Sequence, residues 1–179
     1  GNEAVATVTQ DGKVTAKSKG TAIITVKATD GSNVSASCTV NVVKLVSGIV
    51  LSESEMTLNE GQSAQLTATV LPDLASNKTL SWSSSNEAIA IVTQEGKITA
   101  ISKGTAIITA TSTDGSNIST SCTVNVVKLV SGIVLSETEM TLNEGQSAQL
   151  TAIVSSDANN KTLAWSSSCL LYTSDAADD

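Results

Sequence analysis

The chain repeats itself at a distance of 84 residues. Residues 2–70 and 86–154 are identical at 57 of 69 aligned positions. The match resumes after one deletion, and Trp82 reappears as Trp165. Similarity of this extent over a domain-sized period indicates tandem copies of one module.

The repeat predicts one whole module and parts of two others. Residues 44–127 form a complete period. Residues 1–43 match the C-terminal half of a module, and residues 128–168 match the N-terminal half. Because the alignment starts and stops inside a module, we expect the sequence to be a piece of a longer protein.

The last eleven residues depart from the repeat. After Ser168 the repeat predicts Asn-Glu-Ala-Ile-Ala, as in residues 86–90, but residues 169–179 read Cys-Leu-Leu-Tyr-Thr-Ser-Asp-Ala-Ala-Asp-Asp. This segment resembles translated sequencing-adapter read-through. We interpret it as a non-native or disordered tail and leave it out of the fold prediction. The alternative is a natural, divergent terminus.

Alternation of apolar and polar residues predicts strands within the complete period. In residues 65–70, Leu66, Ala68 and Val70 fall on one face and two threonines on the other. Turn residues separate such segments, and none shows helical periodicity. The expected strands span residues 49–51 with 56–58, 65–70, 80–84, 88–93, 97–101, 105–111 and 118–127. The pattern predicts an all-β sandwich of two sheets with a dry aliphatic interior around Trp82.

A set of spaced residues recurs in the module: Gly61, Leu66-Thr67-Ala68, Pro72, Trp82, Ala90, Gly96, Gly104, Cys122, Val124 and Val126. This pattern resembles that of the bacterial immunoglobulin-like domain, group 2. The resemblance covers residues 1–168 and is complete across about 47–127, departing where Ser155-Ser156 replaces Leu71-Pro72. It implies an immunoglobulin-like sandwich in tandem repeats, located extracellularly or on the bacterial cell surface.

Composition argues against an enzyme. The chain has no His, and all ten basic residues are Lys, so imidazole bases, imidazole metal ligands and Arg clamps are missing. A net charge of −7 with 2% aromatic residues disfavours nucleic acid as a partner. No apolar run approaches the ~18 residues of a membrane span. We predict no catalytic residue, no cofactor, no metal ligand and no membrane insertion.

Cysteines and tryptophans are interpreted as core residues. Cys38 and Cys122 are equivalent positions one module apart, too far for a disulfide, and both are expected to point inward as free thiols. Trp82 and Trp165 are expected to occupy the same core position.

Acidic side chains are the remaining candidates for chemistry. Glu53 with Glu55, and Glu137 with Glu139, have the spacing of one strand face, but we interpret them as solvated charge. Weak calcium binding near a module junction is the alternative. The Asp-Gly-Ser-Asn runs that begin at Asp114 and, in the preceding copy, at residue 30 are interpreted as hairpin turns.

Residues 42–49 pass from one module into the next without a Pro-rich or Gly/Ser-rich spacer. We therefore expect a stiff array and a non-catalytic structural or adhesive role as spacer or contact module. Its partners would be neighbouring modules and a protein or glycan of the host or cell wall. The alternative is an accessory, carbohydrate-contacting module of an extracellular polysaccharide-degrading enzyme.

The two half modules are expected to leave open sheet edges, which are adhesive. Together they amount to one module, so they could complement each other between chains or within one chain.

Overall fold

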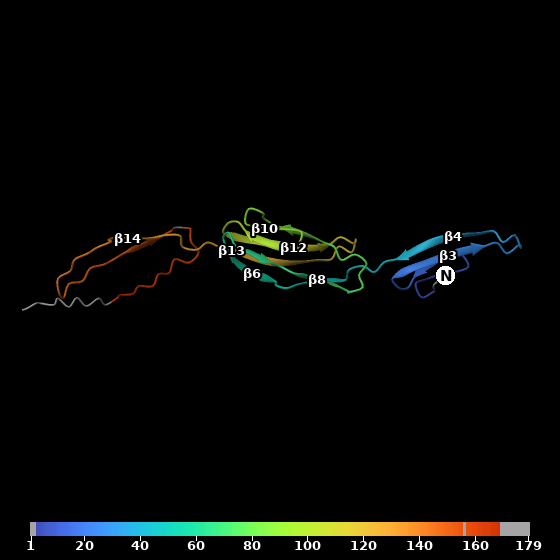
Figure 1. The fold of residues 1–179 in the computed structure, drawn as a ribbon, viewed down its shortest axis with the longest axis horizontal. Coiled ribbons are helices and arrows are strands. Elements are labelled where there is room, and N and C mark those ends of the chain that lie inside the picture. The colour runs from blue at the N-terminus through green and yellow to red at the C-terminus, as the bar shows by residue number, and fades with distance from the viewer. Residues whose placement is uncertain (1–2, 156, 169–179) are drawn as a thin grey trace, which may run out of the picture. The chain divides into compact units, whose positions relative to one another are not determined.

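The computed structural model describes residues 3–155 and 157–168, and every regular element among them is a β-strand (Figure 1). This confirms the predicted all-β class. The chain divides into two compact units, Gly1–Val127 and Lys128–Asp179. The module boundaries expected at residues 43, 127 and 168 stay predictions. The segment interpreted as a non-native tail, 169–179, lies outside the described residues.

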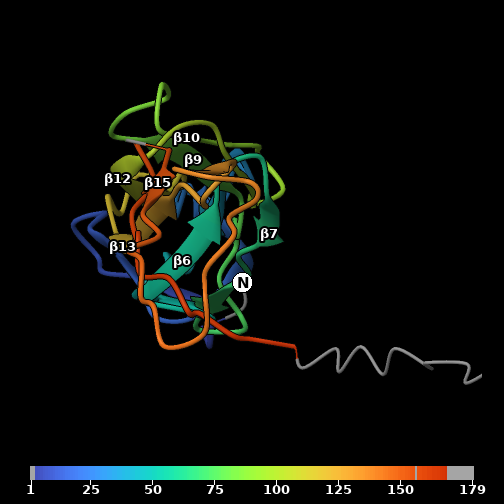
Figure 2. The same ribbon diagram turned by 90° about the vertical axis from the view of Figure 1, so that its left-hand side faces the viewer.

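The complete module is a sandwich of short strands. Its four-stranded sheet has the order β6-β13-β12-β9, and strands β10-β11-β7 and β5-β8 form the opposing layer. In the view of Figure 2, β12 and β13 lie on one side and β7 on the other. All strand pairs are antiparallel except β6 with β13, which is parallel. The strands are β5 Gly48–Leu51, β6 Glu55–Asn59, β7 Ser63–Gln65, β8 Ala68–Leu71, β9 Leu80–Ser84, β10 Ala90–Val92, β11 Lys97–Ala100, β12 Gly104–Ser112 and β13 Ser119–Val127.

The strand expected over residues 65–70 is divided in two. Strand β7 ends at Gln65 and pairs with β11, whereas β8 begins at Ala68 and pairs with β5. Between them, Leu66 N–H donates to the carbonyl of Gly96, and the carbonyl of Thr67 accepts from Ser52. The chain changes its pairing partner at these two residues, while the predicted inward face, with Leu66 and Val70 buried, is retained.

Alternating side chains of β12 and β13 form the centre of the core. Ile108, Cys122 and Val124 are fully buried, and Ile108 lies opposite Cys122 in the ladder. Trp82 on β9 faces Ala110 of β12 and is 8% exposed. The dry aliphatic interior with one large aromatic residue is therefore present as predicted.

The turn between β10 and β11 requires a glycine. Gly96 has a φ of +81°, and a Cβ added there would lie 2.4 Å from the carbonyl oxygen of Leu66 and 3.2 Å from Trp82 Cζ2. Without a side chain, the Gly96 backbone can pass close under the indole ring.

The incomplete repeats keep the local pairing of the complete one. In the first unit, β1 Ala6–Val8 pairs with β2 Val14–Ala16, and β3 Gly20–Lys27 pairs with β4 Ser35–Val42. In the second unit, β14 Ile133–Leu135 pairs with β15 Ala152–Val154. Each pair has the register of its counterpart in the complete module: Ile24 lies opposite Cys38 as Ile108 lies opposite Cys122.

Two core predictions are wrong for the half modules. Cys38 is exposed, although its counterpart Cys122 is fully buried. Trp165 is 59% exposed, although its counterpart Trp82 is buried. Each residue occupies the same position in the repeat as its buried counterpart. In the complete module an opposing layer covers this position, but the described residues of its own unit do not supply that layer.

Candidate functional site: the module junction

The segment that enters the complete module is tied into that module by backbone hydrogen bonds. β4 ends at Val42 and β5 begins at Gly48. Between them, Lys44 N–H donates to Ser76 Oγ at 2.9 Å, and Ser76 N–H donates to the Lys44 carbonyl at 2.7 Å. Ser47 N–H donates to the carbonyl at residue 71 at 2.8 Å. The segment therefore has fixed partners at the last residue of β8 and in the loop that follows it.

A carboxylate holds the middle of the same segment. Val46 N–H donates to Asp114 Oδ2 at 2.6 Å, across 68 residues of sequence. The other oxygen, Oδ1, accepts from Ser116 Oγ at 2.6 Å and from Ser116 N–H at 3.0 Å. Charge-assisted hydrogen bonds of this length are stronger than neutral ones.

These bonds set the ionisation of Asp114. The hydroxyl of Ser116 and then the backbone N–H of Val46 lower the pKa of Asp114 from 3.8 to about 2. The carboxylate is therefore ionised throughout the physiological range, so its bond to Val46 persists there.

Apolar packing adds to the polar contacts. Val46 is 3% exposed and packs with Ile49, Val70 and Ala75 in a second, smaller core cluster. The junction residues thus belong to the body of the module, and Val46 adds buried apolar surface at its end.

The next junction repeats the arrangement in the second unit. Lys128 N–H donates to Asn159 Oδ1 at 2.7 Å, and Asn159 N–H donates to the Lys128 carbonyl at 2.9 Å. Lys128 also forms an ion pair with Asp157. Lys128 is the counterpart of Lys44, and Asn159 is the counterpart of Ser76. In both repeats, a side-chain oxygen at this loop position therefore accepts the hydrogen bond from the lysine N–H.

Sequence reasoning did not find this role of Asp114. The predicted hairpin turn is present between β12 and β13, with Asn117 at a φ of +57°. However, the contact with Val46 joins parts of the chain that are distant in sequence, so no local sequence pattern predicts it. The recurrence of an Asp-Gly-Ser-Asn turn in each copy was the one available signal.

The predicted acidic candidates do not converge. Glu55 Oε1 accepts from Asn125 Nδ2 at 2.8 Å on the outer face of β6 and β13, and Glu53 is exposed. Glu137 and Glu139 are exposed in the second unit. In the part of the chain that the structure describes, no three His, Cys, Asp or Glu side chains gather as a metal site would need.

An open pocket beside Trp82 is lined by polar side chains, including Gln65, Lys78 and Gln94. Gln65 Nε2 already donates to the Glu95 carbonyl at 2.7 Å, and Gln94 exchanges hydrogen bonds with the backbone of Trp82. Gln65 thereby holds the β10–β11 turn against β7, and Gln94 holds it against β9, which is a structural role for both amides. Among the described residues there is also no helix of the length and apolarity needed to cross a bilayer.

The sandwich defines an immunoglobulin-like domain. Residues 45–124 match the family model of the bacterial Ig-like domain (group 2). This confirms the predicted resemblance, and the matched segment is a group 2 bacterial Ig-like domain.

Related proteins are much longer than this chain. It is 46% identical over 125 residues to an uncharacterized protein of Clostridium acetobutylicum, covering 69% of this chain and 13% of that protein. It is 47% identical over 66 residues to an alpha-L-arabinofuranosidase of Bifidobacterium longum, covering 37% of this chain and 6% of that enzyme. Among solved structures, surface layer protein SbsC, domains 1–6, is similar with 23% identity and a TM-score of 0.42, covering 75% of this chain and 20% of that one.

Proposed function

We propose that this module is a non-catalytic spacer or contact unit of a bacterial surface or secreted protein. The carrying observation is the junction, where residues 44–47 are hydrogen-bonded into the body of the module. A segment held in this way limits the rotation of the preceding module, which favours a stiff array over a flexible string. Its partners in this role are the neighbouring modules and a protein or glycan of the host or cell wall.

Nuclear magnetic resonance relaxation of the 179-residue chain tests the proposal. We expect ¹⁵N order parameters of about 0.85 at Lys44, Val46 and Ser47, equal to those of the core strands. The D114A variant should lower the value at Val46. The matched variant D30A alters the equivalent turn of the first repeat, where the carboxylate bonds Ser32, and should leave the junction unchanged. Values below about 0.6 at residues 44–47 in the unaltered chain would refute a stiff spacer.

The alternative is an accessory module that contacts carbohydrate, and similarity to an arabinofuranosidase favours it. Affinity electrophoresis in gels containing arabinan separates the two roles. A pure spacer migrates at the same rate with and without the polysaccharide. Retardation of the chain that persists after mutation of Trp82 would favour the carbohydrate-contacting role instead.

A further inference from the structure

We propose that the pocket beside Trp82 binds one uncharged sugar residue of a glycan. This inference rests on the carbohydrate-contacting role given above as the alternative, and it assigns that role to one place in the complete module. The pocket has a volume of about 410 Å³, within the range of about 300–1,000 Å³ that ligand sites have. Its described lining residues lie between Gln65 and Glu95, so the complete module forms the pocket by itself.

The pocket lies at the open side of the sandwich. Strand β9 is the edge of its sheet and pairs only with β12. The lining combines Leu80 and Trp82 of β9 with Thr67 and Ala68 of the opposing layer. Leu80 and the edge of the indole give an apolar wall against which the C–H bonds of a sugar ring can pack. Because Trp82 is only 8% exposed, most of the recognition falls to the polar groups.

Two amides are already fixed in the pocket and keep part of their hydrogen-bonding capacity. Gln94 exchanges one hydrogen bond in each direction with the backbone of Trp82. Gln65 Nε2 donates to the carbonyls of Leu66 at 3.2 Å and Glu95 at 2.7 Å. A side-chain amide has two donors and two acceptor lone pairs, so Gln94 keeps one of each and Gln65 keeps its Oε1 as an acceptor. Because both amides are held in place beforehand, a ligand would bind without the entropic cost of ordering them.

Three further polar groups of the lining are available to a ligand. In the part of the chain that the structure describes, Lys78 Nζ and the hydroxyls of Thr67 and Thr79 have no hydrogen-bond partner. An ammonium group only donates, whereas a hydroxyl both donates and accepts. The hydroxyl groups of a sugar also donate and accept, so they match this mixed set of donors and acceptors.

The charges of the pocket favour an uncharged ligand. Lys78 and Glu95 are the charged residues of the described lining, and their formal charges cancel. An acidic sugar would be attracted by Lys78 but repelled by Glu95, so the pocket offers it no net advantage. A neutral sugar residue meets neither penalty.

The same side chains recur in the neighbouring repeats. Lys78 and Thr79 recur as Lys161 and Thr162, and Gln94 recurs as Gln10. Each complete module of an array would therefore present an equivalent pocket. Several weak contacts to one polymer then add up through their high effective concentration.

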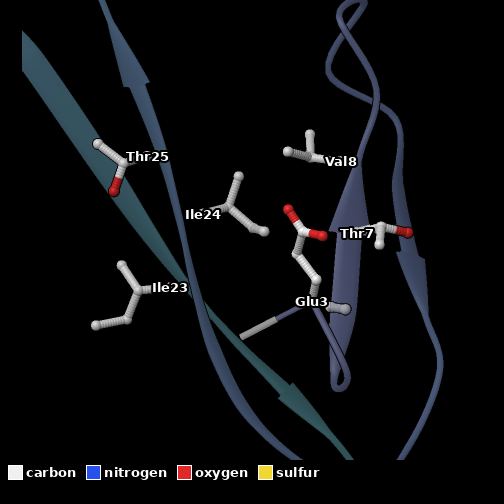
Figure 3. Close-up of a pocket in the computed structure, with 7 residues that line it drawn as sticks. Glu3, Thr7, Val8, Ile23, Ile24 and Thr25 are labelled. Atoms are coloured by element: carbon white, nitrogen blue, oxygen red, sulfur yellow. The ribbon is translucent and has the colours of Figure 1, made fainter. Parts of the chain in front are cut away.

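A pocket in the first repeat provides an internal comparison. It has a volume of about 380 Å³, and Figure 3 shows the side chains of Glu3 and Ile24 in the space between β1 and β3. Among the described residues, its lining carries the carboxylate of Glu3 and no side-chain amide. The set of fixed amides and free hydroxyls is therefore particular to the pocket beside Trp82, and a neutral sugar should distinguish the two.

A ¹H–¹⁵N nuclear magnetic resonance titration of the 179-residue chain with arabinotriose, cellotriose and chitotriose tests the proposal. We expect at least one of these uncharged sugars to shift the side-chain NH₂ signals of Gln65 and Gln94. The NH₂ signal of Gln62, whose Oε1 accepts from Asn59 N–H outside the pocket, should not move. The backbone signal of Ile24, in the pocket of Figure 3, should not move either.

Two matched variants locate the contact. K78A removes the free ammonium group and should raise the dissociation constant of the sugar at least about fivefold. K97A removes the same charge from β11, outside the described lining, and should leave the dissociation constant unchanged. Both lysines are exposed, so neither substitution disturbs the core. T79V keeps the shape of the side chain and should also weaken binding, because it removes one hydroxyl.

The possible failures are distinct. Shifts confined to other surfaces would overturn the pocket and leave the carbohydrate-contacting role in place. No shift with any of the three sugars would overturn both, whereas the spacer role is measured separately by relaxation. Equal weakening by K78A and K97A would indicate a general effect of charge, and would overturn the assignment to this pocket.

Discussion

The carboxylate of Asp114 accepts a 2.6 Å hydrogen bond from the backbone N–H of Val46, and this bond ties the entry of the module to its β12–β13 turn. The two residues are 68 positions apart in sequence. The turn therefore has two roles, since it reverses the chain and also fixes the segment that joins this module to the preceding one.

This bond predicts an acid-sensitive junction. Folding lowers the pKa of Asp114 from 3.8 to about 2, through Ser116 and then Val46. A depressed pKa stabilises the fold above about pH 4, and this contribution is lost as the pH falls through 2. Carboxyl ¹³C titration should give a pKa near 2. In urea unfolding, the stability difference between the unaltered chain and D114N should be constant above pH 4 and shrink below it. Titration of Asp114 near 3.8 would contradict the bond.

The buried turn glycine predicts a steric effect. Gly96→Ala places a Cβ 2.4 Å from the carbonyl of Leu66 in a left-handed conformation, and should destabilise the module by about 3 kcal/mol or more. Gly115→Ala is the matched control, because its φ is +87° and nothing lies within 4 Å of the added Cβ. It should cost only about 1 kcal/mol. Equal losses in urea unfolding would show that the close approach to Leu66 does not exist.

The single aromatic residue of the complete core predicts a large truncation cost. Trp82→Ala leaves a cavity beside Ala110 and should lower the free energy of unfolding by about 3–5 kcal/mol, measured by circular dichroism. The neighbouring Ser83 on the same strand is exposed, and Ser83→Ala should change stability by no more than about 0.5 kcal/mol. A loss below 1 kcal/mol for Trp82→Ala would contradict its place in the core.

The two equivalent cysteines predict different reactivity. Burial, and then the charges of Glu53 and Glu55, raise the pKa of the Cys122 thiol. A buried thiol with a raised pKa has little reactive thiolate. In dilute Cys169→Ser protein, Cys38 should react with a thiol reagent at once and Cys122 only on unfolding. Mass spectrometry of tryptic peptides distinguishes the two sites, and rapid labelling of Cys122 in the folded chain would contradict its burial.

Most of the fold of the complete module could be predicted from its sequence. Alternation placed Leu66, Ile108 and Val124 on inner faces, and turn residues marked most strand ends. The division of the 65–70 strand could not be predicted, because the change of partner at Leu66 and Thr67 depends on residues far along the chain. The same holds for the contact of Asp114 with Val46.

The half modules show the limit of pattern-based reasoning most clearly. Residues 139–143 have the same sequence as β6 but form no strand, and Leu142 is 46% exposed where Leu58 is 9% exposed. Identical residues receive the same predicted structure from any local rule. Strand formation and burial depend on a partner, here the equivalent of β13, and sequence periodicity carries no information about whether that partner is present.

The parallel pairing of β6 with β13 joins the first part of the module to its last strand. A tensile load applied at the two ends would act along these strands and strain their inter-strand hydrogen bonds together in shear. An antiparallel terminal pair pulled from one end would instead open bond by bond, like a zip. The parallel pairing of β6 with β13 thus gives the module mechanical resistance to tension between its two ends.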